Sequence, residues 1–380
     1  MSAPLAGVRV LDLTQLLPGP MCTLHLADMG AEVIKVEPPK GGDAARGMGR
    51  GEFSTLFCML SRNKGSLALD LKTDAGVAII KELVKSADVL VEGFRPGVMD
   101  KLGLGWAALS AINPKLVYCA ISGYGQSGAR AALAGHDINY QALAGTLDQN
   151  GAAGMDPISG NFPLADIAGG ALSAATAILA ALFDVARGGE GRYIDVAMAD
   201  SATVHNVMAQ AGAAQAKEAP ARGEDYLSGA LACYGVYRTA DNRHLAVGAI
   251  EFKFWQAFCE RIERNDLIAQ GHVAGESGRA ARAELAGEIA RHTLAEWTQK
   301  LEGLDACVTP VLSTEEARTD ALKRGVAFDG VHPVFGAYPG FAPPFRMSGC
   351  DFTVAREAPA LGADNARLLA EIGYTPRDAN

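Results

Sequence analysis

The sequence contains fewer basic than acidic residues. Its 380 residues hold 34 Lys and Arg against 43 Asp and Glu, which gives a net charge of −9 with neutral His. A nucleic-acid-binding surface usually appears as a basic excess, so no nucleic-acid partner is expected. An anionic small molecule would have to be held by a few local Arg and Lys side chains.

The cysteines and histidines form no recognisable ligand pattern. Seven Cys are scattered without a C-x-x-C pair, and seven His show no clustered metal-ligand spacing. The sequence also lacks an H-E-x-x-H motif, a Walker A loop and a G-x-S-x-G nucleophile elbow. With no recognisable secretory signal, these features predict a cytoplasmic protein with reduced thiols and no metal site.

Long, strongly apolar runs are missing too. No residue from Ile167 to Phe183 is charged, but the run consists mainly of Ala and Gly. It also falls short of the roughly 20 strongly apolar residues that a membrane span needs. We interpret it as a buried, tightly packed helix and expect no membrane partner.

The length and composition predict a folded protein with more than one core. Hydrophobic residues make up 49% and charged residues 20% of the chain, as in ordinary globular proteins. A chain of 380 residues is too long for one core, so one large and one smaller domain, or two of similar size, are expected. Mixed charges with Pro220 and Gly223 indicate a linker near Ala216–Glu224.

Strand patterns alternate with helical patterns in the first half, which predicts an α/β fold with an open parallel sheet. The expected strands are Val8–Leu13, Glu32–Glu37, Ser66–Leu71, Val89–Val91, Leu116–Ile121 and Tyr193–Val196. A Gly-rich loop follows the second strand, a helix is expected over Asp200–Ala216, and Pro333–Arg346 is expected to be an extended tail.

The segment Gly123–Gly128 formally matches the dinucleotide fingerprint G-x-G-x-x-G. It follows a late strand and no helix opens directly behind it, so we interpret it as a turn. The first strand-to-helix connection, Leu17–Pro20, lacks the fingerprint. We therefore expect neither NAD nor FAD.

His136 and Asp166 are the candidate reactive residues. Each precedes an apolar helical pattern, where a side chain can reach a cleft from rigid backbone. Asp137 would cap a helix over residues 138–147, which places His136 just outside the helix N-terminus. A His and a carboxylate suit proton abstraction from carbon, or acyl transfer through a carboxylate nucleophile. Taken singly, Asp166 also fits a helix N-cap and His136 a packed loop residue.

Many short motifs occur along the chain in a characteristic order. They are Pro4–Asp12, Pro18–Pro20, Gly30–Glu37, Asp70–Lys72, Glu92–Gly97, Gly123–Gly128 and Gly191–Met198. Together they resemble the family III CoA-transferase superfamily over essentially the whole chain. Within it, Gly135–Tyr140, Leu164–Gly170 and Gly248–Glu251 look like the α-methylacyl-CoA racemase branch.

This resemblance implies epimerisation of a 2-methyl-branched acyl-CoA, with His136 and Asp166 as opposing bases and Glu251 as the partner of His136. No metal or redox cofactor is implied. Backbone N–H groups near Asp166–Gly170, at a helix N-terminus, would stabilise the enolate oxygen.

Two alternatives remain open. The transferase branch uses the residue matching Asp166 as a nucleophile that forms acyl-anhydride and CoA-thioester intermediates. It typically lacks the His and commonly carries a glycine-rich flap, and no run of Gly occurs in Tyr234–Glu251. The third reading is a CoA-binding protein without catalysis.

The acyl-CoA substrate carries three phosphate groups that Arg and Lys side chains can neutralise. The candidate CoA-binding residues are Arg95, then Lys72 with its neighbour Leu71, then Arg62 and Lys64, and finally Asp137 and Tyr140 near the thiol end. Pro38 stands where many family members have a basic residue, so the contact of that residue with the adenine or a phosphate is either lost or taken by Lys40.

The resemblance also implies an interlocked homodimer. Each chain would have a large Rossmann-like domain (1–215), a linker (216–225), a smaller α+β domain (226–330) and a C-terminal return to the large domain (331–380). The cleft would lie between the large domain of one chain and the small domain of the other. Glu251 would then reach His136 across the dimer.

Overall fold

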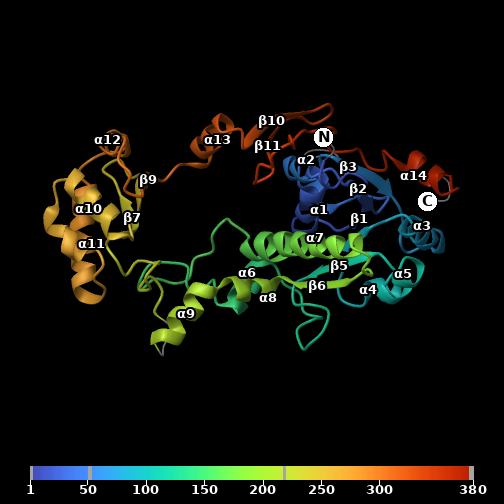
Figure 1. Cartoon of the computed structure of the whole chain (residues 1–380), viewed down its shortest axis with the longest axis horizontal. Helices are drawn as coiled ribbons and strands as arrows, with labels where there is room; N and C mark the ends of the chain where they lie inside the picture. Colours follow the sequence, from blue (N-terminus) through green and yellow to red (C-terminus); the bar gives the residue numbers. More distant parts are fainter. Residues whose placement is uncertain (1–2, 50–53, 217–219, 376–380) are drawn as a thin grey trace. The chain divides into compact units, whose positions relative to one another are not determined.

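The computed structural model describes residues 3–49, 54–216 and 220–375. Contacts divide the chain into two units (Figure 1). Unit 1 comprises the described residues up to Ala144, Asn161–His205 and those from Asp320 onward, and unit 2 comprises Gly145–Gly160 and Asn206–Thr319. These bounds differ from the predicted divisions after 215 and 330, and part of the predicted linker lies outside the described residues.

Unit 1 contains a parallel sheet with the strand order β3-β2-β1-β4-β5-β6, which confirms the predicted α/β class. Its strands are β1 (Arg9–Leu13), β2 (Glu32–Glu37), β3 (Lys64–Ala68), β4 (Val89–Glu92), β5 (Val117–Ser122) and β6 (Tyr193–Ala197). Val10 of β1 pairs with Val33 on one side and with Val89 on the other. This is the doubly wound order, in which ligands bind beyond the carboxyl ends of the strands.

Side chains on the two faces of the sheet enter two separate cores. Val10, Val33 and Val91 pack into one core, while Leu11 and Leu90 pack into the other. The alternation follows from the period of two along a strand. Both faces are covered, which explains the nearly continuous apolar character of the strands.

Helices and one hairpin complete unit 1. They are α1 (Pro18–Asp28), the 3-10 helix η1 (Ala44–Met48), α2 (Thr55–Ser61), α3 (Asp74–Val84), α4 (Val98–Lys101), α5 (Trp106–Ile112), α6 (Asp137–Ala144), the π-helix η2 (Ala165–Leu172), α7 (Ser173–Ala186), α8 (Met198–His205), the hairpin β10 (Ala327–His332) and β11 (Gly336–Phe341), and α14 (Asn365–Glu371). A further helix, α13 (Thr314–Lys323), crosses the boundary between the units.

Several element predictions need correction. The third strand begins at Lys64 rather than Ser66. The sequence gives no sign of this start, because Lys64 is charged and its buried partner, Asp12, lies far away in the sequence. The predicted Gly-rich loop contains η1 and leads into α2, which Ser54 caps by accepting the Phe57 amide at 3.0 Å. The predicted helix over Asp200–Ala216 is divided, and the predicted extended tail contains β11.

The apolar run forms one helical segment, Ala165–Ala186, of 22 residues. By length and composition alone it could cross a membrane, but the core helix of a globular protein passes the same test. Several of its side chains, among them Ala171, Ala174 and Ile178, are buried in the core that covers one face of the sheet. The segment covers this face, but only 39% of its apolar window is buried and Leu172 and Phe183 are exposed, so the prediction of a buried helix holds for one side of the segment.

The C-terminal part of unit 1 protects the edge strand β3. The carboxylate of Asp364 accepts the Ser66 amide at 2.9 Å, and the side chain of Asn365 both accepts from and donates to the Ala68 backbone. Arg356 holds Asp364 in an ion pair at 2.7 Å. An exposed edge invites pairing with other chains, and this segment covers it.

Unit 2 has its own core around a three-stranded antiparallel sheet in the order β7-β8-β9. Its elements are α9 (Val207–Ala216), β7 (Tyr234–Arg238), β8 (His244–Gly248), α10 (Phe252–Arg261), the 3-10 helix η3 (Asn265–Gln270), α11 (Gly275–Ile289), α12 (Leu294–Lys300) and β9 (Val308–Pro310). Trp255 and Trp297 are fully buried in this core. Unit 2 is thus an α+β structure.

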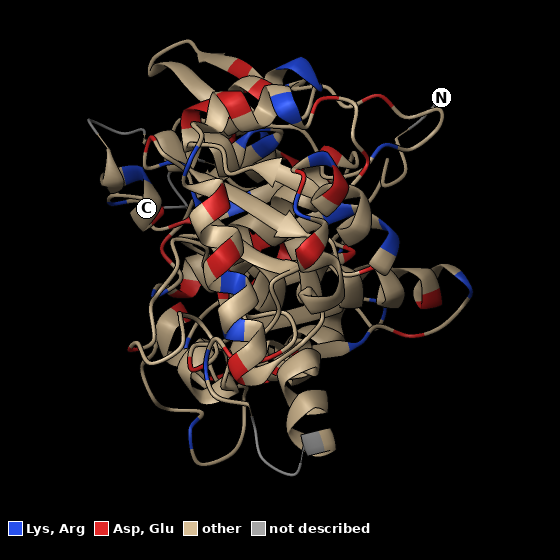
Figure 2. Cartoon of the chain, turned by 90° about the vertical axis from the view of Figure 1, so that its left-hand side faces the viewer, with Lys and Arg blue, Asp and Glu red and all other residues tan. Residues whose placement is uncertain are grey.

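Lys and Arg positions alternate with Asp and Glu positions along the helices and loops in Figure 2. An anionic ligand would therefore depend on particular cations rather than on a uniformly basic face. This agrees with the net charge of −9.

Candidate functional site

The segment that carries the candidate reactive residue His136 follows the carboxyl end of β5. The chain turns after Ser122 and returns through Gly135 and His136 to the start of α6. Asp166 lies in the first turn of η2. Both residues belong to unit 1.

Asp137 joins the starts of these two elements. Its Oδ1 accepts the backbone N–H groups of Ala165 at 2.7 Å and Asp166 at 3.1 Å, and its Oδ2 accepts from Gln141 at 2.5 Å. Asp137 is therefore the first residue of α6 and holds η2, which corrects the prediction that it caps its own helix. Its bonds to the two amides bring the neighbourhoods of His136 and Asp166 together.

The environment of Asp166 favours its neutral form. Burial raises its pKa most, the Asp137 carboxylate adds to this, His136 acts in the opposite sense, and the resulting pKa is about 6. The effect of His136 on this pKa shows that the two side chains lie within electrostatic range. A carboxyl group with a pKa near 6 can both remove and return a proton near neutral pH.

The side chains of His136 and Asp166 are available to a ligand. His136 is exposed and Asp166 is partly buried. Among the described residues, neither the imidazole nor this carboxylate forms a side-chain hydrogen bond or ion pair. The backbone of His136 is fixed, because its N–H donates to Asn139 Oδ1 at 3.0 Å and its carbonyl accepts the Asn139 amide at 2.8 Å.

The first amide groups of η2 are already occupied. Those of Ala165 and Asp166 donate to Asp137, and that of Ile167 donates to the Pro163 carbonyl at 2.9 Å. The prediction that the helix start offers free N–H groups to an enolate therefore does not hold for Asp166 and Ile167.

Two glycines hold η2 close to its neighbours. A Cβ added at Gly170 would lie 2.9 Å from Cβ of Pro18, and one added at Gly169 would lie 3.0 Å from the Met198 carbonyl oxygen. A larger side chain would push η2 away from α1 or α8. π-Helical segments within α-helices often occur at functional sites.

Tyr140 supports the loop that carries His136. Its hydroxyl donates to the Gly135 carbonyl at 2.6 Å, and its ring packs edge-on against Tyr124. Burial raises the pKa of Tyr140 to about 12. Predicted as a CoA contact, Tyr140 is in this structure a buried residue that fixes the loop.

Two of the predicted phosphate ligands are exposed cations beyond the carboxyl ends of strands. Lys72 follows β3 and Arg95 follows β4, and both side chains are exposed. Leu71, beside Lys72, is half-buried and packs against the adjoining core. Lys40, beyond β2, is also exposed.

The structure gives Arg62 and Lys64 another role. Arg62 pairs with Asp28 at 2.6 Å and donates to the Phe341 carbonyl, and Lys64 pairs with Asp12 at 3.2 Å. The Lys64 ammonium also donates to the Pro20 carbonyl and the Thr23 hydroxyl. Both side chains are buried, so neither offers a free face to a phosphate, contrary to the prediction.

Glu251 lies in unit 2, at the position before α10. It is exposed, and its carboxylate does not cap the helix by a hydrogen bond. Among the described residues its carboxylate has no side-chain partner. The expected approach to His136 across a dimer stays a prediction.

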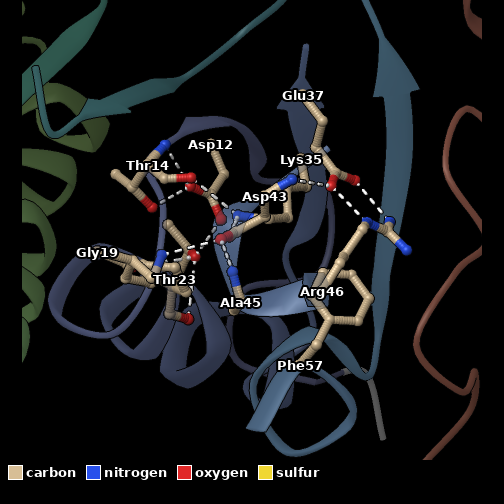
Figure 3. A network of polar contacts seen from close by, with 12 residues as sticks. Asp12, Thr14, Gly19, Thr23, Lys35, Glu37, Asp43, Ala45, Arg46 and Phe57 are labelled. Carbon is tan, nitrogen blue, oxygen red and sulfur yellow. Dashed lines mark hydrogen bonds and ion pairs between the residues drawn. The ribbon is translucent and has the colours of Figure 1, made fainter. Parts of the chain in front are cut away.

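A buried polar network that the sequence reading did not single out lies at the ends of β1 and β2 (Figure 3). Lys35 of β2 pairs with Asp43 at 2.6 Å, and both side chains are buried. The available signal was a charged residue between the apolar residues Ile34 and Val36 of this strand. In the described part of the chain, no group of three or more His, Cys, Asp or Glu side chains is arranged to hold a metal ion.

Comparison with known proteins identifies the family. Residues 5–365 match the family described as CoA-transferase family III. The chain belongs to this family.

Relatives within family III carry names of two reaction types. Alpha-methylacyl-CoA racemase of Homo sapiens is 41% identical over 374 residues, which cover 98% of this chain and 94% of the racemase. Succinyl-CoA:glutarate CoA-transferase of Mus musculus is 33% identical over 381 residues, which cover 97% of this chain and 86% of the transferase.

A solved family structure has the same fold. The crystal structure of a CAIB/BAIF family protein from Brucella suis matches with a TM-score of 0.84 at 27% identity, covering 98% of this chain and 100% of that chain. The reaction of this family III member must therefore be inferred from its site residues.

Proposed function

We propose that this protein epimerises 2-methyl-branched acyl-CoA thioesters by 1,1-proton transfer, with His136 and Asp166 as the two bases. The observation that carries the proposal is the pairing of an exposed His with a carboxyl group whose pKa is about 6. The 41% identity to a racemase adds support. The proposal includes an acyl-CoA substrate, no metal or redox cofactor and a cytoplasmic homodimer.

The reaction needs two bases because the proton leaves one face of the α-carbon and another returns to the opposite face. In one direction, ionised Asp166 removes the α-proton, and the C–H electron pair moves into the thioester to form an enolate. Protonated His136 then donates its proton to the other face and becomes neutral. The reverse direction exchanges the two roles, and no net oxidation occurs.

Glu251 would orient His136 and stabilise its imidazolium form. Its exposed, unpaired carboxylate in unit 2 supports a role toward another molecule rather than within its own helix. We assign it to the second chain of the dimer. Arg95 and Lys72 would hold the phosphate groups of the CoA.

Transfer of CoA between carboxylic acids is the second candidate. It is favoured by the transferase relative at 33% identity and by the unbonded carboxylate of Asp166, which can act as a nucleophile. His136 has no role in that reaction, and this ranks the epimerase first.

Single substitutions test the proposal. His136→Asn and Asp166→Asn should each lower the inversion rate by about 10²–10⁴-fold, measured by chiral chromatography, while CoA-ester affinity measured calorimetrically changes little. His244→Asn and Asp156→Asn, both exposed sites in unit 2, are matched controls. Full activity of either site variant removes that residue from the mechanism.

A chemical trap separates the two candidates. Hydroxylamine would convert an acyl intermediate on Asp166 into a hydroxamate that peptide mass spectrometry detects. The epimerase gives no such product with acyl-CoA, whereas the transferase does.

A further inference from the structure

The connection from β1 to α1 is held in a conformation that few side chains adopt. Leu16 has a φ of 66°, in the left-handed region, which is unfavourable for a residue other than glycine. Such a conformation persists only where the surroundings determine it. The turn from Thr14 to Pro18 must therefore be fixed by its contacts.

Lys35 and Asp43 supply these contacts. The Lys35 ammonium donates to the Thr14 carbonyl at 2.9 Å, and Asp43 Oδ1 accepts the Leu16 amide at 3.0 Å. The two side chains pair at 2.6 Å with exposed fractions of 0% and 1%. Asp43 also accepts the Ala45 amide at 2.9 Å, which anchors it to η1. Figure 3 shows the pair between the ends of β1 and β2.

A buried ion pair is weak as a source of stability, since desolvation offsets most of its attraction. Here one member bonds the Thr14 carbonyl and the other bonds the amide of the strained Leu16 itself. The arrangement therefore specifies a conformation, which is the role that such pairs serve best.

The turn is in contact with the element that carries Asp166. It ends at Pro18, and a Cβ on Gly170 would lie only 2.9 Å from Cβ of Pro18. Gly170 and Asp166 belong to the same π-helix. A displacement of Pro18 would thus be transmitted to η2 rather than absorbed by a gap.

We propose that the buried Lys35 and Asp43 side chains position Asp166 for proton transfer, because their hydrogen bonds to the backbone fix the Thr14–Pro18 turn against which η2 packs. The inference rests on the proposed function, in which Asp166 is a base. Lys35 and Asp43 are positioning residues, since they act through the turn and through η2.

Three variants separate positioning from stability. Asp43→Ala removes both the charge and the acceptor, whereas Asp43→Asn removes the charge and keeps an oxygen for the Leu16 and Ala45 amides. Asp28→Ala is the control, because Asp28 is also 1% exposed and pairs with buried Arg62, but lies at the other end of α1.

The first readout is amide hydrogen exchange by mass spectrometry without substrate. In Asp43→Ala, peptides that cover the turn and η2 should exchange faster than in the wild type. They should stay close to wild type in Asp43→Asn and Asp28→Ala. Unchanged exchange in Asp43→Ala, or an equal change in Asp28→Ala, overturns the inference. This readout needs no turnover, so it decides the inference even if the wild type proves not to be an epimerase.

The second readout is kinetic. Asp43→Ala should lower kcat for epimerisation by about 10- to 100-fold, as misplaced catalytic groups do, while KM changes less than about threefold. Asp43→Asn should keep kcat within about threefold of wild type despite its lost ion pair. Equal kcat losses in Asp43→Ala and Asp28→Ala would contradict a positioning role. If Asp43→Ala does not fold, Lys35→Met decides by the same two readouts, and wild-type behaviour there overturns the inference.

Discussion

Replacing Asp137 by Asn should shift the pH dependence of the reaction in a direction that the structure fixes. Asp137 is the second cause of the raised pKa of Asp166, after burial. Asn keeps the Oδ1 that accepts the Ala165 and Asp166 amides, and it removes the negative charge together with the Oδ2 that accepts from Gln141. The pKa of Asp166 should therefore fall from about 6.

The size of the shift is limited by solvent, because Asp166 is only partly buried. A neighbouring charge of this kind contributes roughly 0.5 to 1 pKa unit once screening is included. At pH 5.5 the ionised fraction of Asp166 would rise from about one quarter to between about a half and three quarters. For the epimer whose proton Asp166 removes, the rate at this pH should rise in the same proportion.

The assay is kcat/KM for each epimer from pH 4.5 to 8, for the wild type and Asp137→Asn. The acidic midpoint of one profile should move down by that amount, and Asp156→Asn should leave it unchanged. An acidic midpoint that stays in place or moves upward in Asp137→Asn refutes the electrostatic account of Asp166.

The remaining predictions concern stability, substrate binding and assembly. The folded state raises the pKa of Asp166, so ionising this carboxyl group destabilises the fold. This loss of stability develops as pH rises from about 4 to 6 and is complete above about 6. Asp166→Asn should therefore raise the melting temperature by about 1–2 °C at pH 7.5 and by less at pH 4.5. Arg95→Met should raise KM about tenfold without changing the melting temperature. Lys64→Met should reduce the free energy of unfolding by about 3–5 kcal/mol, because it leaves a buried partner unpaired. If instead Lys64→Met raised KM and Arg95→Met reduced stability, Lys64 would be restored as a phosphate ligand. Mixing and refolding inactive His136→Asn and Glu251→Gln chains should restore activity, because half of the sites in mixed dimers would be intact, and no recovery would place Glu251 outside the partner's site.

Much of the fold could be predicted from local sequence patterns. The order of strands and helices follows from apolar periodicity, and β2, β4 and β6 were predicted almost to the residue. The start of β3 was missed because Lys64 is charged in the sequence, while its partner Asp12 lies on another strand. A pairing between residues so far apart leaves no local signal.

The candidate site was predictable as a set of residues and not as an arrangement. The motifs around His136 and Asp166 marked the reactive pair. The bond from Asp137 to η2 links residues 28 and 29 apart in sequence, so the residue pattern favoured the nearer helix instead. Likewise, Arg62 resembled a surface cation because its partner Asp28 lies in another helix.

The central claim is most directly tested by incubating one pure epimer of a 2-methylacyl-CoA with the wild-type protein in D2O, with no free carboxylic acid present, and following the α-proton by NMR. The two-base account predicts that deuterium enters the α-carbon while the opposite epimer accumulates. Retention of both the α-proton and the configuration, followed by CoA transfer once a free carboxylate is added, would contradict it and identify Asp166 as a nucleophile.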